Sequence, residues 1–372
     1  MSNMILATAS SVFSYIGYIL LALVVLLVMI TVHEFGHYVA GKIFKFKINE
    51  FAIGFGPKLF KRTKKNGEIF SIRLLPLGGF CSFEGEGGSG ESEHPDAFDR
   101  KKPWQRIIVL VSGALMNLIL AWLVITLMLG IYGQQMVQVT KVAEPQTEYV
   151  GYTLEKGDIL ERIDGKKIML ATDIVSAMSG KKQDDIIDVG VRNSGKRYVR
   201  KVRLVMTPTD DLTDIYKSLG IYMLYDTDGV LTGIGARTTN VRYGFFETLG
   251  NSFVYHFKVA GTIFNVLGQL ITGRIGLNSL GGPITTVTQT AEMVKIGGLQ
   301  SLLQITAFIG VNLGVFNLLP LPALDGSHVV FTLIEWIRKK PINKKVEMVI
   351  HACGFVLLLG FAVVVDLLQI FR

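Results

Sequence analysis

The chain has 372 residues, of which 49% are hydrophobic and 18% are charged. Soluble globular proteins carry roughly 25% charged residues, so this composition argues against a wholly soluble protein. The 22 Phe and 12 Tyr residues exclude intrinsic disorder, because burial of so many apolar side chains offsets the entropy of the chain. The two cysteines, Cys81 and Cys353, define neither a disulfide framework nor a cysteine metal cluster, so any metal must be held by histidine and carboxylate side chains.

Four apolar segments are long enough to cross a membrane as helices: residues 11–32, 107–132, 299–321 and 349–370. At 1.5 Å per residue, each one spans roughly 30 Å of hydrocarbon. A signal peptide is the alternative for the first segment, but no basic residue precedes it. Residues 252–272 are apolar but interrupted by His256, Lys258 and glycines, which is typical of an amphipathic or re-entrant helix. The sequence therefore predicts a multi-pass α-helical membrane protein with about four transmembrane helices.

The positions of the basic residues predict how these helices are oriented. The net charge is +8, and Lys and Arg crowd residues 42–106 and 338–345, which lie between predicted spans. Because basic loops stay on the cytoplasmic side, we expect both segments to be cytoplasmic. The region between the second and third spans and both termini are then extracytoplasmic. This topology accounts for the basic excess, so we expect a lipid bilayer as partner and no nucleic acid.

The first predicted span continues into the motif His33-Glu34-Phe35-Gly36-His37. Residues i and i+4 share one face of a helix, so both imidazoles can reach one zinc ion at about 2.0–2.1 Å, with Glu34 beside the bound water. The alternative is a polar cluster that caps a helix at the membrane interface. Three ionisable groups at the end of an apolar helix are costly, and such groups usually mark function. The motif therefore favours a zinc hydrolase.

A catalytic zinc site needs a third protein ligand, and Asp325 is the strongest candidate. It follows Pro320 and Pro322, which break the third predicted span and free backbone groups that must line a wet cavity or be buried in protein. The other histidines are poorer candidates, and for His328 both a second-shell role and a solvated or core role remain open. Asp366, near the outer end of the fourth span, is predicted to be an interfacial charge.

The His33–His37 motif, the Gly113-x-x-x-Asn117 pattern and the segment from Asn317 to Gly326 together resemble the site-2 protease family. The resemblance covers nearly the whole chain and is closest to the bacterial RseP/RasP-type branch. It implies a zinc-dependent intramembrane endopeptidase that cleaves transmembrane segments of single-pass proteins. Such substrates are anti-sigma factors already shortened by an upstream trimming protease, or remnant signal peptides.

By this resemblance His33, His37 and Asp325 match the zinc ligands, Glu34 matches the catalytic glutamate, and Asn317, Pro320 and Pro322 match a turn that accommodates the substrate. Two positions depart from the family pattern. Ala114 stands where many relatives have a proline, and residues 144–151 lack the usual small-residue approach to a peptide-binding loop.

Residues 51–60 and 69–75 predict strands, with a turn at residues 54–57. The resemblance implies a membrane-associated β-hairpin here that pairs with unwound substrate, and strand addition is a sound way to hold a peptide extended. Gly78, Gly79 and Phe80 are the hairpin residues expected to bind substrate, together with Asn117 on the second span. The alternative is a loop that packs under the helices.

The central region predicts a small αβ domain. Residues 136–142 and 157–163 alternate as strands, and residues 184–206 read as two strands joined at Asn193-Ser194-Gly195. Thr172 is expected to cap a short helix that runs to Met178. This pattern is typical of a PDZ-like domain, and the alternative is any other small mixed domain. We expect it to exclude substrates with large ectodomains.

These predictions divide the chain as follows: a first transmembrane helix with the zinc motif (1–41), a cytoplasmic loop with the hairpin (42–103), a second transmembrane helix (104–132), the PDZ-like domain (133–208), an extracytoplasmic linker with an amphipathic or re-entrant helix (209–298), a third transmembrane helix (299–328), a cytoplasmic loop (329–347) and a fourth transmembrane helix (348–372). One alternative function is a membrane zinc protease that acts on soluble or cytoplasm-facing peptides. The other is a scaffold or transporter. The complete ligand set with Glu34 argues against it, and so does the lack of paired repeats among the predicted spans.

Overall fold

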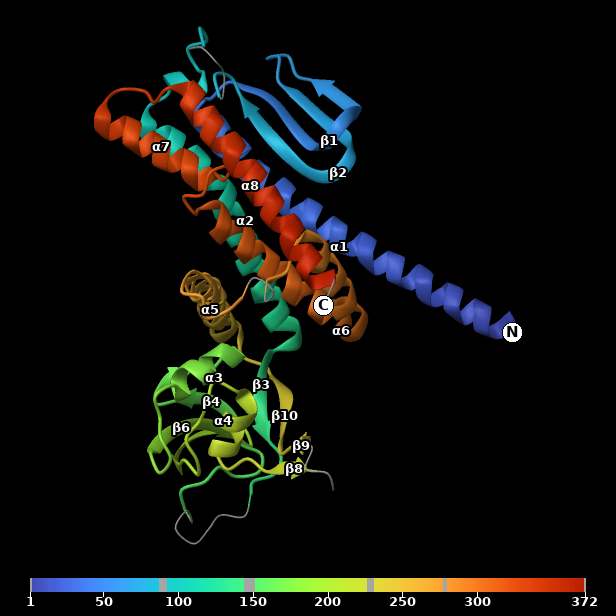
Figure 1. The fold of residues 1–372 in the computed structure, drawn as a ribbon, viewed down its shortest axis with the longest axis vertical. Helices are drawn as coiled ribbons and strands as arrows, with labels where there is room; N and C mark the ends of the chain where they lie inside the picture. The colour runs from blue at the N-terminus through green and yellow to red at the C-terminus, as the bar shows by residue number, and fades with distance from the viewer. Residues whose placement is uncertain (1, 87–91, 144–150, 226–230, 277–279, 371–372) are drawn as a thin grey trace. The chain divides into compact units, whose positions relative to one another are not determined.

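The computed structural model describes residues 2–86, 92–143, 151–225, 231–276 and 280–370 (Figure 1). The chain divides into two compact units, Met1–Leu127 with Val259–Arg372, and Met128–Lys258. The first unit holds the long apolar helices and a β-hairpin, and the second holds an antiparallel sheet. The segment 144–151, which departs from the family pattern, lies outside the described residues except for Gly151.

Four helices are long and apolar enough to cross a membrane: Tyr15–Ile43 within α1 (Ser2–Ile43), α2 (Pro103–Tyr132), α6 (Pro283–Asn317), and Lys344–Gln369 within α8 (Lys344–Ile370). They confirm the prediction of about four long apolar helices that are candidate membrane spans. Helix α5 (Phe245–Ile271) is not among these four. Helix α2 runs unbroken through Ala114.

Glycines bring α1, α2 and α6 into close contact. A Cβ atom at Gly36 would lie 2.3 Å from the carbonyl oxygen of Ser112, and one at Gly310 would lie 3.0 Å from the Cβ of Ala121. Without side chains at these points, helix backbones approach closely, as small residues allow in membranes. Met29 is fully buried beside this crossing. The crossing holds the stretch of α1 that carries the zinc motif against α2.

The third predicted span is two helices in the structure. Helix α6 contains a left-handed residue at Gly298 (φ 57°) and ends at Asn317, and α7 (Asp325–Arg338) begins after a seven-residue loop, 318–324. The predicted break at the prolines is therefore confirmed.

The prediction that Asp366 is an interfacial charge is wrong, because its side chain is only 5% exposed. Its carboxylate accepts hydrogen bonds of 3.0 Å from the backbone N–H groups of Ile284 and Thr285, and so caps α6 from helix α8.

The hairpin consists of two long, bent strands, β1 (Ile48–Thr63) and β2 (Ile69–Phe83). Residues 48–53 pair with residues 79–83 on one side and with residues 69–72 on the other. Residues 69–72 in turn pair with residues 60–63. Gly54 (φ 86°) and Gly78 (φ 125°) adopt the left-handed backbone needed where the strands bend. The predicted turn at 54–57 is thus a bend within β1, and the segment 79–83 forms one edge of the folded hairpin.

A buried carboxylate joins this hairpin to α1. Glu68 is 1% exposed and accepts hydrogen bonds from Tyr38 and Lys42 of α1 and from Lys64 of β1's neighbouring turn. Burial acts to raise the pKa of Glu68, but the hydrogen bonds outweigh it and lower the pKa to about 2. Glu68 therefore remains ionised and anchors the hairpin beside the zinc motif.

The second unit contains a sheet with strand order β10-β3-β4-β6-β7, with β5 paired to β4. Its strands are β3 (Gln134–Val139), β4 (Ile159–Ile163), β5 (Lys166–Lys167), β6 (Ile186–Asn193), β7 (Lys196–Arg203) and β10 (Ala236–Val241), with a separate pair β8 (Met223–Tyr225) and β9 (Leu231–Ile234). Helices α3 (Ala171–Met178) and α4 (Leu212–Ser218) complete the unit, and a short 3₁₀ helix, Phe98–Arg100, lies in the first unit. The predicted central strands and helix are confirmed. The predicted Thr172 cap is wrong, because the N-cap position is Leu170.

Candidate metal centre

Three side-chain atoms from two helices converge on one point. His33 and His37 lie one turn apart on α1, as the motif spacing requires, and Asp325 is the first residue of α7. Asp325 Oδ2 lies 2.9 Å from His33 Nε2 and 3.4 Å from His37 Nε2, and the two Nε2 atoms are 3.2 Å apart. Ligand atoms about 2.05 Å from a tetrahedral zinc ion are about 3.3 Å from one another. The spacing of the three atoms therefore fits a zinc site with a fourth position open.

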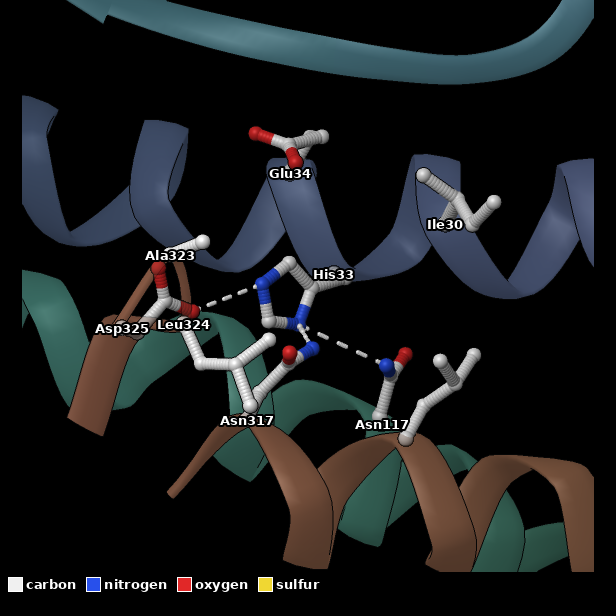
Figure 2. A pocket seen from close by; sticks show the side chains of 9 residues that line it. Ile30, His33, Glu34, Asn117, Asn317, Ala323, Leu324 and Asp325 are labelled. Atoms are coloured by element: carbon white, nitrogen blue, oxygen red, sulfur yellow. Dashed lines mark hydrogen bonds and ion pairs between the residues drawn. The ribbon is translucent and has the colours of Figure 1, made fainter. Parts of the chain in front are cut away.

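In each imidazole, the contact made by Nδ1 determines whether Nε2 can offer its lone pair at this point. His37 Nδ1 lies 2.8 Å from the carbonyl oxygen of Val109, an acceptor, so Nδ1 carries the proton and Nε2 presents its lone pair. His33 Nδ1 lies 3.5 Å from the side-chain amide of Asn117 and 3.4 Å from that of Asn317 (Figure 2). Two amides from two other helices thus hold the His33 ring.

Unsatisfied buried atoms also indicate a cation. Asp325 Oδ2 and Asn117 Oδ1 are buried without a hydrogen-bond partner among the described residues. If the Asn117 amide is turned by 180°, its Oδ1 accepts a hydrogen bond from a proton on His33 Nδ1. This hydrogen bond satisfies both groups and leaves the lone pair of His33 Nε2 free to bind metal. Asp325 Oδ2 and two imidazole lone pairs then face one another with no proton between them. A metal ion at this point removes that repulsion.

Glycines again set the geometry, here on both sides of the site. A Cβ atom at Gly113 of α2 would lie 2.3 Å from His37 Nε2 and 2.9 Å from His33 Cε1. A Cβ atom at Gly326 would lie 2.3 Å from the carbonyl oxygen of Leu319, in the loop just after α6. Only glycine at 113 leaves room for both imidazoles, and only glycine at 326 lets α7 begin so close behind α6.

Glu34 projects from α1 toward β2, away from the side on which His33 faces Asp325 (Figure 2). Its Oε2 accepts a 2.9 Å hydrogen bond from the backbone N–H of Cys81, in the edge segment 79–83. A Cβ atom at Gly79 would lie 3.5 Å from Glu34 Cγ, so the strand backbone runs directly beside this carboxylate. The thiol of Cys81 is partly buried, and this burial raises its pKa, so it stays protonated.

A cavity of about 200 Å³ opens beside the three converging atoms. Its polar lining is His33, Glu34, Asn117, Asn317 and Asp325, and its apolar lining is Ile30, Leu313, Ala323 and Leu324. The lining comes from α1, α2, α6, the loop before α7 and the first residue of α7. A water molecule and a peptide carbonyl fit in this space, next to a carboxylate that can accept a proton.

The structure therefore brings together most of the residues predicted from the sequence. His33, His37, Asp325, Glu34, Asn117 and Asn317 meet at the cavity or its edge, and Gly79 lies against Glu34. The remaining predicted residues, Pro320, Pro322, Gly78 and Phe80, do not line the cavity; Phe80 stacks on Phe55 within the hairpin instead. Sequence reasoning missed the Val109 carbonyl and the Cys81 N–H, since main-chain groups carry no residue signal. Gly113 did carry a residue signal, because it is the first residue of the Gly113-x-x-x-Asn117 pattern.

Residues 21–361 match peptidase family M50. The chain belongs to peptidase family M50. It is 31% identical to a predicted zinc metalloprotease of Agrobacterium fabrum, over 93% of this chain and 94% of the relative. A predicted zinc metalloprotease of Clostridium perfringens is 32% identical, over 95% and 98% of the two chains. The regulator of sigma-W protease RasP of Bacillus subtilis is 28% identical, over 90% of this chain and 93% of the relative.

Membership of M50 makes this protein a zinc metalloprotease of the site-2 protease type, as the motifs predicted. The group formed by His33, His37 and Asp325 can hold the metal. A second group of three potential ligands, His328, Glu347 and His351, lies between α7 and α8. His328 therefore contacts Glu347 rather than the zinc motif, with Nδ1 3.3 Å from the Glu347 carboxylate.

Proposed function

We propose that this M50 protease hydrolyses peptide bonds within transmembrane segments of single-pass proteins. His33, His37 and Asp325 would be the zinc ligands and Glu34 the general base. One observation carries this proposal: both histidines lie inside a candidate membrane-spanning helix, and the cavity beside them is lined by residues of three such helices. A scissile bond that reaches this cavity therefore lies at membrane depth.

The roles of the chain's own groups follow from their positions. Zinc, when bound, supplies Lewis acidity that makes a water molecule acidic near neutral pH and polarises a carbonyl group. The Glu34 carboxylate, in the same cavity, accepts the proton of the attacking water and passes it to the leaving amine. Asn117 and Asn317 keep His33 oriented throughout, because their amides contact its Nδ1.

A peptide bond within a helix is shielded by its own hydrogen bonds, so the substrate must unwind before attack. Among the described residues, the edge segment 79–83 has a strand partner on one side only, and its Cys81 N–H donates to Glu34. We propose that unwound substrate adds to this edge, with Gly78, Gly79 and Phe80 in contact with it. Asn117 and Asn317 would contact substrate beside His33, and the turn that holds Pro320 and Pro322 would accommodate it.

The substrate class is proposed from the resemblance and from a relative. The Bacillus subtilis relative is named the regulator of sigma-W protease RasP. This name supports anti-sigma factors as substrates, after trimming by an upstream protease, and remnant signal peptides are the other class. Both are single-pass segments that must be extended to be cleaved.

We also propose the predicted topology for this protein in the cell membrane. The zinc site and residues 42–103 and 329–347 would be on the cytoplasmic side, and both termini and residues 133–208, as a PDZ-like domain, would be extracytoplasmic. Positive residues in the short loops support this orientation.

If residues 133–208 filter substrates by size, deleting residues 136–206 makes untrimmed substrates susceptible to cleavage. Unchanged resistance of such substrates contradicts the filter.

Helix α5, within the predicted linker 209–298, would lie on the membrane surface. Phe246, Phe253, Phe257, Phe264 and Ile271 are 55–85% exposed and recur at spacings that place them on one face of the helix. Asn251 and Lys258 of the same helix instead bond to Lys167 and Asp173. An apolar stripe opposite a polar, protein-bound face suits a helix that rests on lipid.

The proposed function is tested with purified wild type, Glu34→Gln and Asp325→Ala in detergent, each incubated with a model single-pass peptide. Zinc content and the position of cleavage are measured together. We expect about one zinc and cleavage within the apolar stretch for wild type, zinc without cleavage for Glu34→Gln, and loss of zinc for Asp325→Ala. Cleavage confined to polar, soluble peptides would instead favour a membrane-bound protease of soluble segments.

A further inference from the structure

We propose that His351 and Gly354, both on α8, are positioning residues that hold the loop before Asp325 and thereby set the geometry of the zinc site. This inference rests on the proposed role of Asp325 as a ligand. Asp325 reaches the two histidines from the end of a loop, residues 318–324, that has no helix or strand of its own. The loop has two backbone hydrogen bonds of its own, from Leu321 N–H to the Leu319 carbonyl and from Leu324 N–H to the Leu321 carbonyl, and α8 adds contacts from outside.

The loop contains a backbone conformation that needs external support. Ala323, two residues before Asp325, has φ 76°, in the left-handed region that residues with a Cβ rarely adopt. Such conformations persist where the surrounding structure holds them, and they cluster at functional sites. The backbone N–H of Ala323 donates a 3.0 Å hydrogen bond to Nδ1 of His351. This bond ties the strained residue to a different helix.

Gly354 supports the same loop one turn further along α8. A Cβ atom at Gly354 would lie 2.2 Å from the Cβ of Pro322 and 2.9 Å from its carbonyl oxygen. Residues i and i+3 of a helix lie on one face, so His351 and Gly354 together present a single surface to the loop. Pro322 rests where Gly354 leaves space, and Ala323 bonds to His351 beside it.

A second metal site is the alternative use of this region, because His328, Glu347 and His351 bring potential ligand atoms together. The geometry argues against it. Since Nδ1 of His351 accepts the Ala323 hydrogen bond, the proton of the neutral ring is on Nε2, which then has no lone pair for a metal. The His328 and His351 rings are also stacked 3.8 Å apart and nearly parallel, at 11°. A metal binds in the plane of an imidazole ring, and these two planes do not meet within bonding distance of both rings.

The test compares pairs of variants of the full chain in detergent. His351→Leu removes the acceptor, whereas His351→Asn keeps an amide oxygen where Nδ1 was. Gly354→Ala places a methyl group against Pro322, whereas Gly360→Ala changes the same helix at a point with nothing within 4 Å. Zinc affinity is measured by competition with a chromophoric chelator, and coordination geometry by the visible absorption of the cobalt-substituted protein.

We expect His351→Leu and Gly354→Ala each to weaken zinc binding about tenfold and to change the cobalt spectrum, a loss typical for residues that orient metal ligands. His351→Asn and Gly360→Ala should stay within about twofold of wild type. Wild-type affinity and spectrum in His351→Leu, with metal lost in Asp325→Ala, would overturn this inference and leave the proposed function standing. Wild-type affinity in Asp325→Ala would overturn the ligand set, and with it the inference. Equal losses in His351→Leu and His351→Asn would also refute it, since a purely packing role needs no acceptor.

Discussion

Replacing Gly113 by Ala should destroy the metal centre while leaving the fold intact. The added methyl carbon would lie 2.3 Å from His37 Nε2, whereas such atoms ordinarily approach to about 3.4 Å, so they overlap by about 1.1 Å. The methyl group cannot turn aside, because it is fixed to the α2 backbone. Helix α1 must therefore shift away from α2, or the two imidazoles must leave their places.

Either movement exceeds what a zinc site tolerates. Metal–ligand distances hold within about 0.2 Å, so a shift near 1 Å removes at least one histidine from the coordination sphere. We expect zinc affinity to fall by at least about 100-fold, equivalent to about 2.7 kcal/mol. Overpacking costs about 1–3 kcal/mol of folding free energy, but Ala in place of Gly within a helix returns up to about 1 kcal/mol. The protein should therefore remain folded while it loses metal.

The measurement is a zinc titration against a chromophoric chelator, with the thermal unfolding temperature recorded for each variant. Gly130→Ala is the matched control, because it makes the same change on the same helix at a point with nothing within 4 Å. It should bind zinc as wild type does. If Gly113→Ala binds zinc with wild-type affinity, the close contact between α2 and the imidazoles is not real, and the argument for the site geometry fails.

Replacing Glu34 by Gln should leave zinc bound and lower the rate of peptide hydrolysis by about 10³-fold, measured on a fluorescent transmembrane peptide; full activity would remove Glu34 from its proposed role. Replacing Glu68 by Gln should loosen the hairpin by about 2 kcal/mol at pH 7, seen as faster hydrogen exchange over residues 48–83. Because the pKa of Glu68 is lowered to about 2, its contribution is complete above its ordinary pKa of 4.5 and is lost as the pH falls through 2. The difference from wild type should therefore narrow on acidification, and a constant difference would contradict the ionised anchor. Replacing Asp366 by Ala should lower stability by about 2 kcal/mol through loss of the α6 cap, with Asn restoring part of it, and an unchanged unfolding temperature would speak against the cap.

The zinc motif could be predicted from the sequence because its signal is local. A spacing of four residues places His33 and His37 on one helix face wherever that helix lies. Asp325 needed a second argument, the coincidence of a carboxylate with two helix-breaking prolines. The structure brings its Oδ2 within 2.9 Å of His33 Nε2, and its role as a ligand remains a prediction that the zinc measurements test.

The features that sequence reasoning missed depend on contacts between distant residues. The carboxylate of Asp366 caps a helix whose first amides lie 82 residues earlier, and no local pattern marks such a pairing. The bends of the hairpin were visible as glycines, but the double pairing of residues 48–53 depends on long-range register. Cys81 contributes only its backbone N–H to Glu34, and every residue except proline has one.

The cap on α6 also affects how the protein is made. Ile284 leaves the ribosome long before Asp366, so α6 is synthesised while the amides of its first turn still lack their carboxylate. The same late helix, α8, carries His351, which bonds to the loop in front of Asp325. Both contacts form only after α8 has been synthesised and inserted. A nascent chain therefore cannot complete the surroundings of Asp325 until α8 has been translated.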